Sequence, residues 1–488
     1  MRMIGSPSDC VKDPASVKGT MENLSGPRYG RPSHRFGPPT ALFSPELALL
    51  KCDLDHLDTF TPNSVEANSA FRFIASATAF FDDDDLRQVV LEPLLAGLLR
   101  GRCQWRGPVA GGSAKPGGVW LQDIFAYMIL EIKNEQGLRG DPFLQSLIVY
   151  SKVVAQQKVP SSRVHSVLLK CLEQYHAFLG SSNMPVVLLA IAGNRLVVSA
   201  AIFTDSIYAD ELFSINLRFG SHGPENVLRV ARVFMAINRC TDRLRVLYTA
   251  LGAITHPTPT PAKVLWPNPT PDPPTSAEAI KELGELKLEF YSKVDRLRGM
   301  PINQADIDEA NKMHAIYLAR MKSKDGASTC DVLVKFTAKY NKGAHVLLSD
   351  RKPPLAPTLH YFTPVIGNMF MVVMEYIPVS EGKSLYAVSL SAPALEAVRR
   401  DVTQALDLLH GRNLVFGDLR EVNVLYLEKS NRALLVDFDG VGRDGEDRYS
   451  ACLDSEAGLG VDKQQIMEKL HDTENMGRLM DRLSNFGL

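Results

Sequence analysis

The chain has 488 residues and a mass of 53.8 kDa, which is too long for one domain of ordinary size, so we expect two or three domains. Hydrophobic residues make up 45% of the sequence and charged residues 22%, a globular composition with enough apolar residues for sizeable cores. The net charge of −1 excludes a chain that binds nucleic acid through overall positive charge, although it does not exclude a local basic surface.

The first segment of the chain is predicted to be a disordered, mildly basic tail over residues 1–44. The first 40 residues contain six prolines and five glycines and few large apolar side chains. Such a segment cannot bury enough surface to offset the entropy lost on ordering. We therefore expect ordered structure to begin near Pro45.

Residues 45–255 are predicted to form a compact α/β domain, because runs with helical periodicity alternate with short runs rich in β-branched residues. A Gly-Asn pair between the last two runs indicates a hairpin, and the turn Gln136–Gly140 follows the first strand. The predicted helices are Glu46–Asp55, Val65–Phe81, Leu86–Leu99 and Pro142–Gln157, and the predicted strands are Tyr127–Lys133, Pro185–Ile191 and Leu196–Phe203.

A proline-rich stretch marks the clearest boundary. Eight prolines occur in the 18 residues from Pro257 to Pro274, which favours an extended spacer, so we assign residues 256–275 as a linker. The second domain, residues 276–488, is predicted to contain a charged helix, strands around Ile316 and Val332, an apolar strand and a long amphipathic helix. The helices are Ala277–Leu297 and Pro393–His410, and the apolar strand is Met369–Ile377.

The richest chemistry lies between residues 414 and 440. Asp418 and Asn423 are five residues apart in a loop between the long helix and a short strand, and Asp437 ends the next strand. Phosphoryl transfer needs a carboxylate near the acceptor hydroxyl and oxygen ligands that hold Mg²⁺ against the phosphates of the nucleotide. This order of residues supplies those groups.

The same segment resembles the protein kinase-like superfamily, through Asp418-Leu-Arg-Glu-Val-Asn423 and Asp437-Phe-Asp-Gly. Upstream, Val-Leu-Val-Lys335 resembles the strand that carries the phosphate-binding lysine, and Met-Glu375-Tyr resembles the hinge beside the adenine. The resemblance implies a small, divergent bilobal domain that binds ATP and Mg²⁺. It implies Asp418 as catalytic base, Asn423 and Asp437 as metal ligands, Lys335 as the phosphate contact and Glu375 as a hinge residue.

The sequence departs from the kinase pattern in four places. Phe416-Gly417 stands where His-Arg usually precedes the base, and only 51 residues follow Asp437 in the 488-residue chain. No glycine-rich loop precedes Lys335, where we find the strand His314–Arg320 and a polar turn, Lys322–Thr329. No glutamate occurs between Lys335 and Glu375, so we predict that His345 replaces the usual partner of the lysine.

A second constellation lies in the first domain. Glu131 and Lys133 lie on one side of a predicted strand, because side chains alternate along a strand. There a carboxylate can bind Mg²⁺ while the lysine approaches an attacking water or phosphate. Asp123 is the candidate second metal ligand, but on a continuous strand it would be roughly 26 Å from Glu131. A tight hairpin must therefore intervene, or Asp123 is not a ligand.

This pattern resembles the PD-(D/E)xK restriction-endonuclease fold, with Gln145 on the following helix and Glu66 as a weaker third carboxylate. The two halves together resemble fungal Crinkler-type effector proteins. That resemblance implies action on nucleic acid or protein inside a cell, with possible DNA contact through the first domain.

The seven cysteines are scattered, odd in number and never spaced as Cys-x-x-Cys. This usage favours a reducing compartment over a disulfide scaffold or a cysteine-based zinc site. The sequence shows neither a signal peptide nor an apolar stretch of membrane-spanning length. We therefore expect an intracellular protein, in the nucleus or the cytoplasm, without membrane contact.

The leading functional prediction is an ATP-dependent phosphotransferase of protein kinase type, which transfers the γ-phosphoryl group to a protein hydroxyl. Two alternatives stay open at this stage. One is a Mg²⁺-dependent DNA endonuclease whose kinase-like domain is regulatory or degenerate. The other is a non-catalytic interaction protein in which both sites have decayed.

Overall fold

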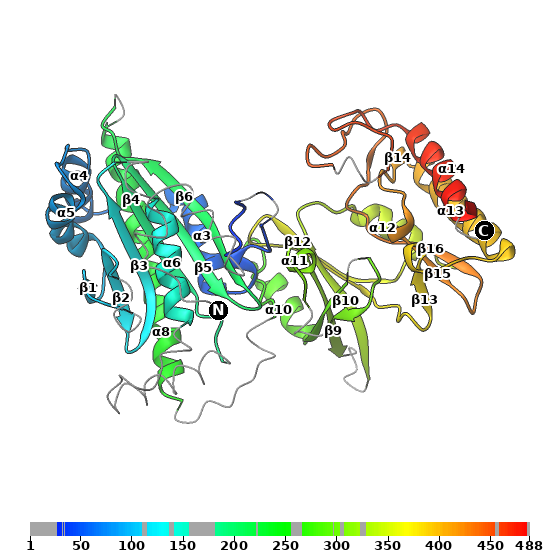
Figure 1. Ribbon diagram of the computed structural model, residues 1–488, viewed down its shortest axis with the longest axis horizontal. Helices are drawn as coiled ribbons and strands as arrows, with labels where there is room; N and C mark the ends of the chain where they lie inside the picture. Colours follow the sequence, from blue (N-terminus) through cyan, green and yellow to red (C-terminus); the bar gives the residue numbers. More distant parts are fainter. Residues whose placement is uncertain are drawn as a thin grey trace. The chain divides into compact units, whose positions relative to one another are not determined.

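The computed structural model describes residues 27–485, except 32, 34, 110–114, 136–140, 156–180, 221–222, 255–265, 296, 303–306, 323–327 and 454–457. The chain divides into two compact units, Met1–Thr270 and Pro271–Leu488, and each is described by itself (Figure 1). The division falls inside the predicted linker, part of which lies outside the described residues, as does the predicted turn Gln136–Gly140. Among the described helices, none combines the length and the apolar character needed to cross a bilayer.

The first unit is built on one six-stranded sheet whose strands follow each other in chain order. Strands β3 and β4 are parallel and all other neighbouring pairs are antiparallel. Parallel neighbours require a crossover, and helix α6 (Pro142–Ala155) lies in that connection. The strands are β1 (Cys103–Trp105), β2 (Gly118–Gln122), β3 (Phe125–Lys133), β4 (Val186–Ala192), β5 (Arg195–Phe203) and β6 (Ile207–Asn216).

Helices cover this sheet. Every residue of β3 from Phe125 to Ile132 is buried, and α5, α6 and α8 all contact this strand. Asn63 and Glu66 form a reciprocal capping box at the start of α4, and Asp83 caps α5, so local sequence fixes where these helices begin. The helices other than α6 are α3 (Pro45–Asp55), α4 (Ser64–Ala77), α5 (Asp84–Leu98) and α8 (Gly223–Gly252).

The predicted tail 1–44 is wrong for its last part. Arg28 bridges to Tyr208 on β6, and its backbone N–H donates to the Ile207 carbonyl at 2.7 Å. The short 3₁₀ helix Thr40–Leu42 is buried. Composition indicated too little apolar surface, but the few apolar residues are concentrated at residues 41–43, where they pack into the core. Residues 1–26 lie outside the described part of the chain.

The second unit contains a six-stranded antiparallel sheet in the order β11-β12-β10-β9-β7-β8. Helix α10 (Ala277–Glu285) precedes the first strand, α11 (Glu309–Lys312) lies between β8 and β9, and α12 (Lys342–Ser349) follows β10. The strands are β7 (Glu289–Val294), β8 (Pro301–Ile302), β9 (Ala315–Lys322), β10 (Thr329–Thr337), β11 (Leu359–Val365) and β12 (Met369–Glu375).

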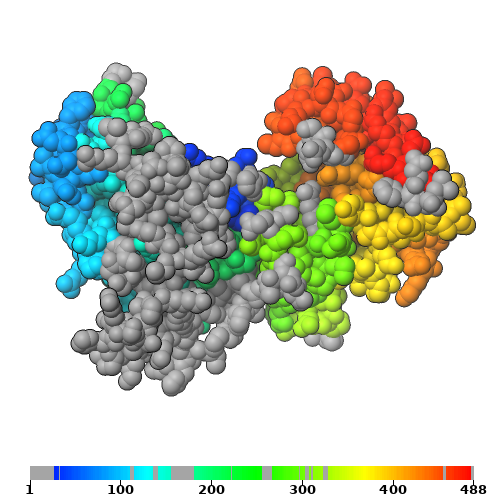
Figure 2. Space-filling model, viewed as in Figure 1, coloured from blue at the N-terminus to red at the C-terminus, as the bar shows by residue number. Residues whose placement is uncertain are grey.

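The remainder of this unit is mainly helical, with two small sheets. Helix α13 (Ala392–His410) buries Val398, Val402 and Leu409, and it packs against the last helix, α14 (Lys469–Asn485), which lies at the surface of this unit (Figure 2). Strands β13 (Gly382–Ser384), β15 (Val424–Leu427) and β16 (Arg432–Leu435) form one small sheet, and β14 (Leu414–Val415) pairs with β17 (Gly442–Arg443).

The predicted helix Ala277–Leu297 is wrong in its second half. Helix α10 ends at Glu285, Lys287 takes a positive φ of 43°, and Glu289–Val294 forms strand β7. Its Phe290, Tyr291 and Val294 are residues that favour strands, and β7 pairs with β9 in the sheet. The connection that precedes the lysine-bearing strand pair is therefore 295–314, between β7 and β9, and not the turn Lys322–Thr329.

Candidate active site

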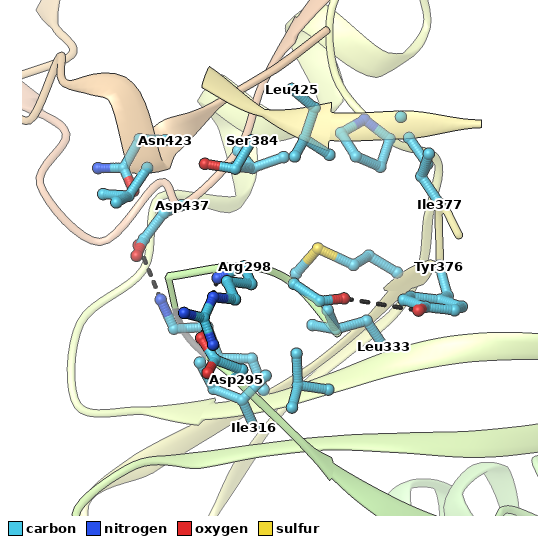
Figure 3. Close-up of a pocket in the computed structure, with 18 of the residues that line it drawn as sticks. Asp295, Arg298, Ile316, Leu333, Tyr376, Ile377, Ser384, Asn423, Leu425 and Asp437 are labelled. Atoms are coloured by element: carbon cyan, nitrogen blue, oxygen red, sulfur yellow. Dashed lines mark hydrogen bonds and ion pairs between the residues drawn. The ribbon is translucent and has the colours of Figure 1, made fainter. Parts of the chain in front are cut away.

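The main pocket of the second unit lies between its large sheet and the small β13-β15-β16 sheet (Figure 3). It measures about 880 Å³ when the open solvent at its mouth is counted. Apolar side chains line much of it, and charged groups are grouped around Lys335 and Asp437. The apolar lining includes Ile316, Leu333, Met374, Ile377 and Leu425.

Lys335 is held between two carboxylates. It lies on the central strand β10, paired with Ile316 on β9 and Val372 on β12. Its Nζ is 2.7 Å from Oδ1 of Asp437 and 2.7 Å from Oδ2 of Asp439. Thr337 is two residues further along the strand and therefore on the same face, and its hydroxyl donates to Oδ2 of Asp439 at 2.7 Å.

Charge and burial shift the protonation of this group. Burial lowers the pKa of Lys335, but the two carboxylates outweigh burial and raise it above its ordinary value of 10.5. Burial and the neighbouring Asp437 raise the pKa of Asp439 to about 6, although Lys335 opposes this shift. The site therefore concentrates negative charge that one lysine does not fully neutralise.

Asp437 has an unusual backbone. It follows β16 with φ +68°, the left-handed region that costs a non-glycine residue about 1–2 kcal/mol. The next residue, Phe438, is fully buried against Phe416 and His345. Packing of this ring holds the strained turn, so the Asp437 carboxylate is directed into the pocket, as the close-up shows (Figure 3).

The acidic groups fit a magnesium ion that also binds phosphate. Within the described residues, Asp439 Oδ1 is buried and has no hydrogen-bond partner, and no three His, Cys, Asp or Glu side chains gather closely enough to hold a metal by themselves. Mg²⁺ is usually bound by one or two carboxylates together with substrate phosphates. Asn423 and Asp437 line the pocket, and Asp439 contacts Lys335 beside them, so these three residues are the candidate oxygen ligands.

Asp418 and Asn423 lie together, as their spacing predicts. The Asn423 amide nitrogen donates to both the carbonyl and Oδ2 of Asp418, each at 2.8 Å. Arg420 forms an ion pair with Asp418, with Nε and Oδ1 2.8 Å apart. Burial raises the pKa of Asp418, although Arg420 opposes this shift. The carboxylate is thus fixed in one orientation at the end of its loop.

The backbone of this loop is anchored by Asp472 on α14, a residue that sequence reasoning missed. Asp472 is fully buried, and its carboxylate accepts from Phe416 N–H at 2.7 Å and from Gly417 N–H at 2.9 Å. The ring of His410, at the end of α13, hydrogen-bonds the same carboxylate at 2.9 Å. No spacing in the sequence marks this residue, because its partners lie more than fifty residues away.

His345 does not replace the missing glutamate. Its Nε2 is 2.7 Å from the Pro357 carbonyl and must therefore carry a proton, and its Nδ1 accepts from the Tyr340 hydroxyl at 2.6 Å. The neutral ring stacks on Phe438 at 4.7 Å, and burial lowers its pKa. Both nitrogens are occupied, so the second carboxylate on Lys335 comes from Asp439 instead. The unusual Asp-Phe-Asp-Gly sequence is the signal that could have indicated this.

Glu375 lies at the end of β12 and lines the pocket. Its carboxylate accepts from the backbone N–H and the hydroxyl of Thr358, each at 3.0 Å. The residues that follow, Tyr376 and Ile377, also line the pocket. This is the edge of the pocket where the sequence placed the adenine.

In the first unit, the structure gathers only part of the predicted site. Lys133 Nζ is 3.1 Å from Asp84 Oδ2 at the start of α5. Glu131 is buried, and burial raises its pKa to about 8, although Lys133 and the Gly117 N–H oppose this shift. A lysine that is already paired and a carboxyl that is neutral at pH 7 do not favour metal-dependent cleavage of DNA.

Two predicted carboxylates lie elsewhere. The intervening hairpin exists, but Asp123 is in its turn, and the pairing of Gln122 with Phe125 puts that turn at the opposite end of β3 from Glu131. The separation is roughly 20 Å at the usual rise per residue, so the prediction for Asp123 is wrong. Glu66 accepts from the Asn63 N–H in a helix cap, and Gln145 is buried on α6.

Comparison with known proteins adds little. No protein-family model and no curated protein sequence matches the chain. One solved structure with some likeness is that of the kinase PK-1 of the Cydia pomonella granulovirus, with 18% sequence identity and a TM-score of 0.31. The likeness covers 42% of this chain and 72% of that one. A likeness of this size supports no functional assignment.

The buried carboxyl group of Glu131 should make the stability of the first unit depend on pH. Its pKa of about 8 in the folded unit is well above its value in an unfolded chain, so the folded state retains a proton that the unfolded state has lost. The wild-type protein should therefore lose stability, by a few kcal/mol, as pH rises from about 4.5 to 8. Glu131→Gln should remove that loss and be the more stable protein at pH 8.

Urea unfolding of both proteins at pH 5 and pH 8 measures this effect. Glu211→Gln, which changes an exposed carboxylate on β6, is the matched control and should behave as the wild type. Equal pH dependence in wild type and Glu131→Gln would contradict the assignment.

The buried Asp472 carboxylate should contribute to the stability of the second unit. Asp472→Asn removes the charge and one acceptor, so at least one buried donor among Phe416 N–H, Gly417 N–H and His410 loses its partner. The free energy of unfolding of the second unit should fall by about 1–3 kcal/mol. Asp481→Asn, an exposed position on the same helix, should have little effect. Chemical denaturation checks both, and equal stabilities would show that the Asp472 contacts are unimportant.

Proposed function

We propose that the second unit binds Mg-ATP in its main pocket and transfers the γ-phosphoryl group to a protein hydroxyl. The observation that carries this proposal is the placement of Lys335 against Asp437 at one side of the pocket, with the Asp418–Asn423 pair beside them. A cation for phosphate, oxygen ligands for Mg²⁺ and a fixed carboxylate for the acceptor are the parts that phosphoryl transfer needs.

The base of the nucleotide would occupy the apolar part of the pocket. Ile316 and Leu333 come from the large sheet, and Leu425 comes from the small sheet. A flat aromatic ring between two apolar surfaces gains from burial on both faces. The backbone at Glu375 and Ile377 would read the edge of the base, because the chain leaves β12 at this point.

The phosphates would then reach Lys335. In the absence of nucleotide, Lys335 forms ion pairs with both Asp437 and Asp439. A bound Mg²⁺ would supply positive charge that stabilises the negative charge of the transferred group. Asp437 and Asn423 would hold that ion, and Lys335 would turn its ammonium group toward the phosphates. Asp439, which accepts a hydrogen bond from the Thr337 hydroxyl, would keep the Lys335 side chain aligned.

Asp418 would orient the acceptor. Its carboxylate is held by Asn423 and Arg420, so its orientation does not have to be selected when the acceptor arrives. The raised pKa of Asp418 improves its ability to accept the hydroxyl proton as transfer proceeds. The loop that carries it is anchored by Asp472, which is a positioning residue and touches no substrate.

The metal and base roles separate experimentally. Asp437→Ala should weaken the binding of Mg-ATP, because it removes a metal ligand. Asp418→Asn should leave binding nearly unchanged and lower the rate of transfer by about 10²–10⁴. Calorimetric titration with Mg-ATP measures the first effect, and transfer of labelled phosphate to the protein itself or to a mixed protein substrate measures the second.

The same two assays on Asp481→Asn give the control, since that carboxylate is exposed on α14. Transfer that persists in both Asp437→Ala and Asp418→Asn would rule out this site as the source of the activity. Absence of nucleotide binding by the wild-type protein would rule out the proposed function itself.

A further inference from the structure

The turn between β7 and β8 covers one side of the pocket. Asp295, Leu297, Arg298 and Gly299 all line the cavity. Within the described residues of the turn, Asp295 Oδ1 accepts from the N–H groups of Leu297 and Arg298, each at 2.9 Å. The Tyr376 hydroxyl contacts the Gly299 carbonyl at 3.5 Å, so the tip of the turn reaches the end of β12 across the pocket.

Two cationic residues line the pocket among the residues that the structure describes, Lys335 and Arg298. They differ in their surroundings. Lys335 is buried between two carboxylates, whereas the Arg298 side chain is exposed to solvent and forms no ion pair with any described carboxylate. Figure 3 shows Arg298 on the side of the pocket where Asp437 lies, and Tyr376 and Ile377 on the other side.

The turn lacks the means that a glycine-rich loop uses. In such a loop, several glycines allow backbone N–H groups to approach the phosphates closely. The whole connection 295–314 contains one glycine, Gly299, and the N–H groups of Leu297 and Arg298 already donate to Asp295. These two N–H groups are therefore not available to an anion.

A guanidinium group supplies what the backbone lacks. It presents several N–H donors in a planar fork that matches two phosphate oxygens, and it stays charged at any physiological pH. The pocket also needs further positive charge, because Lys335 faces both Asp437 and Asp439. We propose that Arg298 binds the phosphate chain of the nucleotide and replaces the backbone cradle of a glycine-rich loop. This inference rests on the proposed function, because it concerns the same nucleotide.

The proposal predicts which ligands depend on Arg298. A phosphate contact affects ATP and ADP and has no effect on adenosine, which fills only the apolar part of the pocket. Arg298→Ala should weaken ATP binding by about 10- to 100-fold, the range for a charge-assisted contact, and should leave adenosine binding unchanged. Arg298→Lys should lie between, because it retains the charge but loses the fork.

The experiment is calorimetric titration of the full chain with ATP, ADP and adenosine, each with and without Mg²⁺. The Arg298→Ala effect on ATP should persist without Mg²⁺, because the contact is direct. Arg399→Ala is the matched control, since Arg399 is exposed on α13 and pairs with Glu396 on the same helix; it should bind all three ligands as the wild type does.

The outcomes separate the two claims. If the wild-type protein binds no nucleotide, the proposed function is wrong. Wild-type binding that is unchanged in Arg298→Ala overturns the role of Arg298 and leaves the proposed function standing. Equal losses for ATP and adenosine would also overturn it, because they would show that Arg298 shapes the apolar part of the pocket and does not bind phosphate.

Discussion

The second unit is organised around one amino group. Lys335 Nζ lies 2.7 Å from a carboxylate oxygen of Asp437 and 2.7 Å from one of Asp439, and this contact joins the central strand of the large sheet to the turn after β16. Two carboxylates this close repel each other, and a cation between them offsets that repulsion. In this structure the lysine pairs with both carboxylates, and a bound metal ion would provide part of the positive charge that they need.

The surrounding structure keeps this contact in place. Phe438 lies between the two aspartates and is locked by the rings of His345 and Phe416. Phe416 begins the loop that carries Asp418, and Asp472 anchors that loop from α14. The 51 residues after Asp437 include α14, the helix that provides this anchor. A substitution of Asp472 would therefore affect the site by shifting the backbone of the loop that carries Asp418.

The parts of the site that the sequence predicted are those set by local geometry. Asp418 and Asn423 meet because five residues of one loop separate them, and Asp437 enters the pocket because it follows a short buried strand. The assignment of His345 failed, because sequence position places a residue on a helix but does not reveal that its ring nitrogens already have partners. Asp439 and Asp472 were missed because their roles depend on contacts between residues far apart in the chain. Asp123 failed for a simpler reason: the hairpin exists, but its turn is at the wrong end of the strand.

The proposed phosphotransfer depends most directly on what Lys335 and Asp437 do when nucleotide is present. A crystal structure of the full chain with Mg²⁺ and a non-hydrolysable ATP analogue would test this. We expect the base between Ile316 and Leu425, a metal ion bound by Asp437, and the Lys335 ammonium group moved from Asp437 to a phosphate oxygen. A nucleotide bound elsewhere, or a pocket that stays empty with the Lys335–Asp437 contact unchanged at saturating nucleotide, would contradict it.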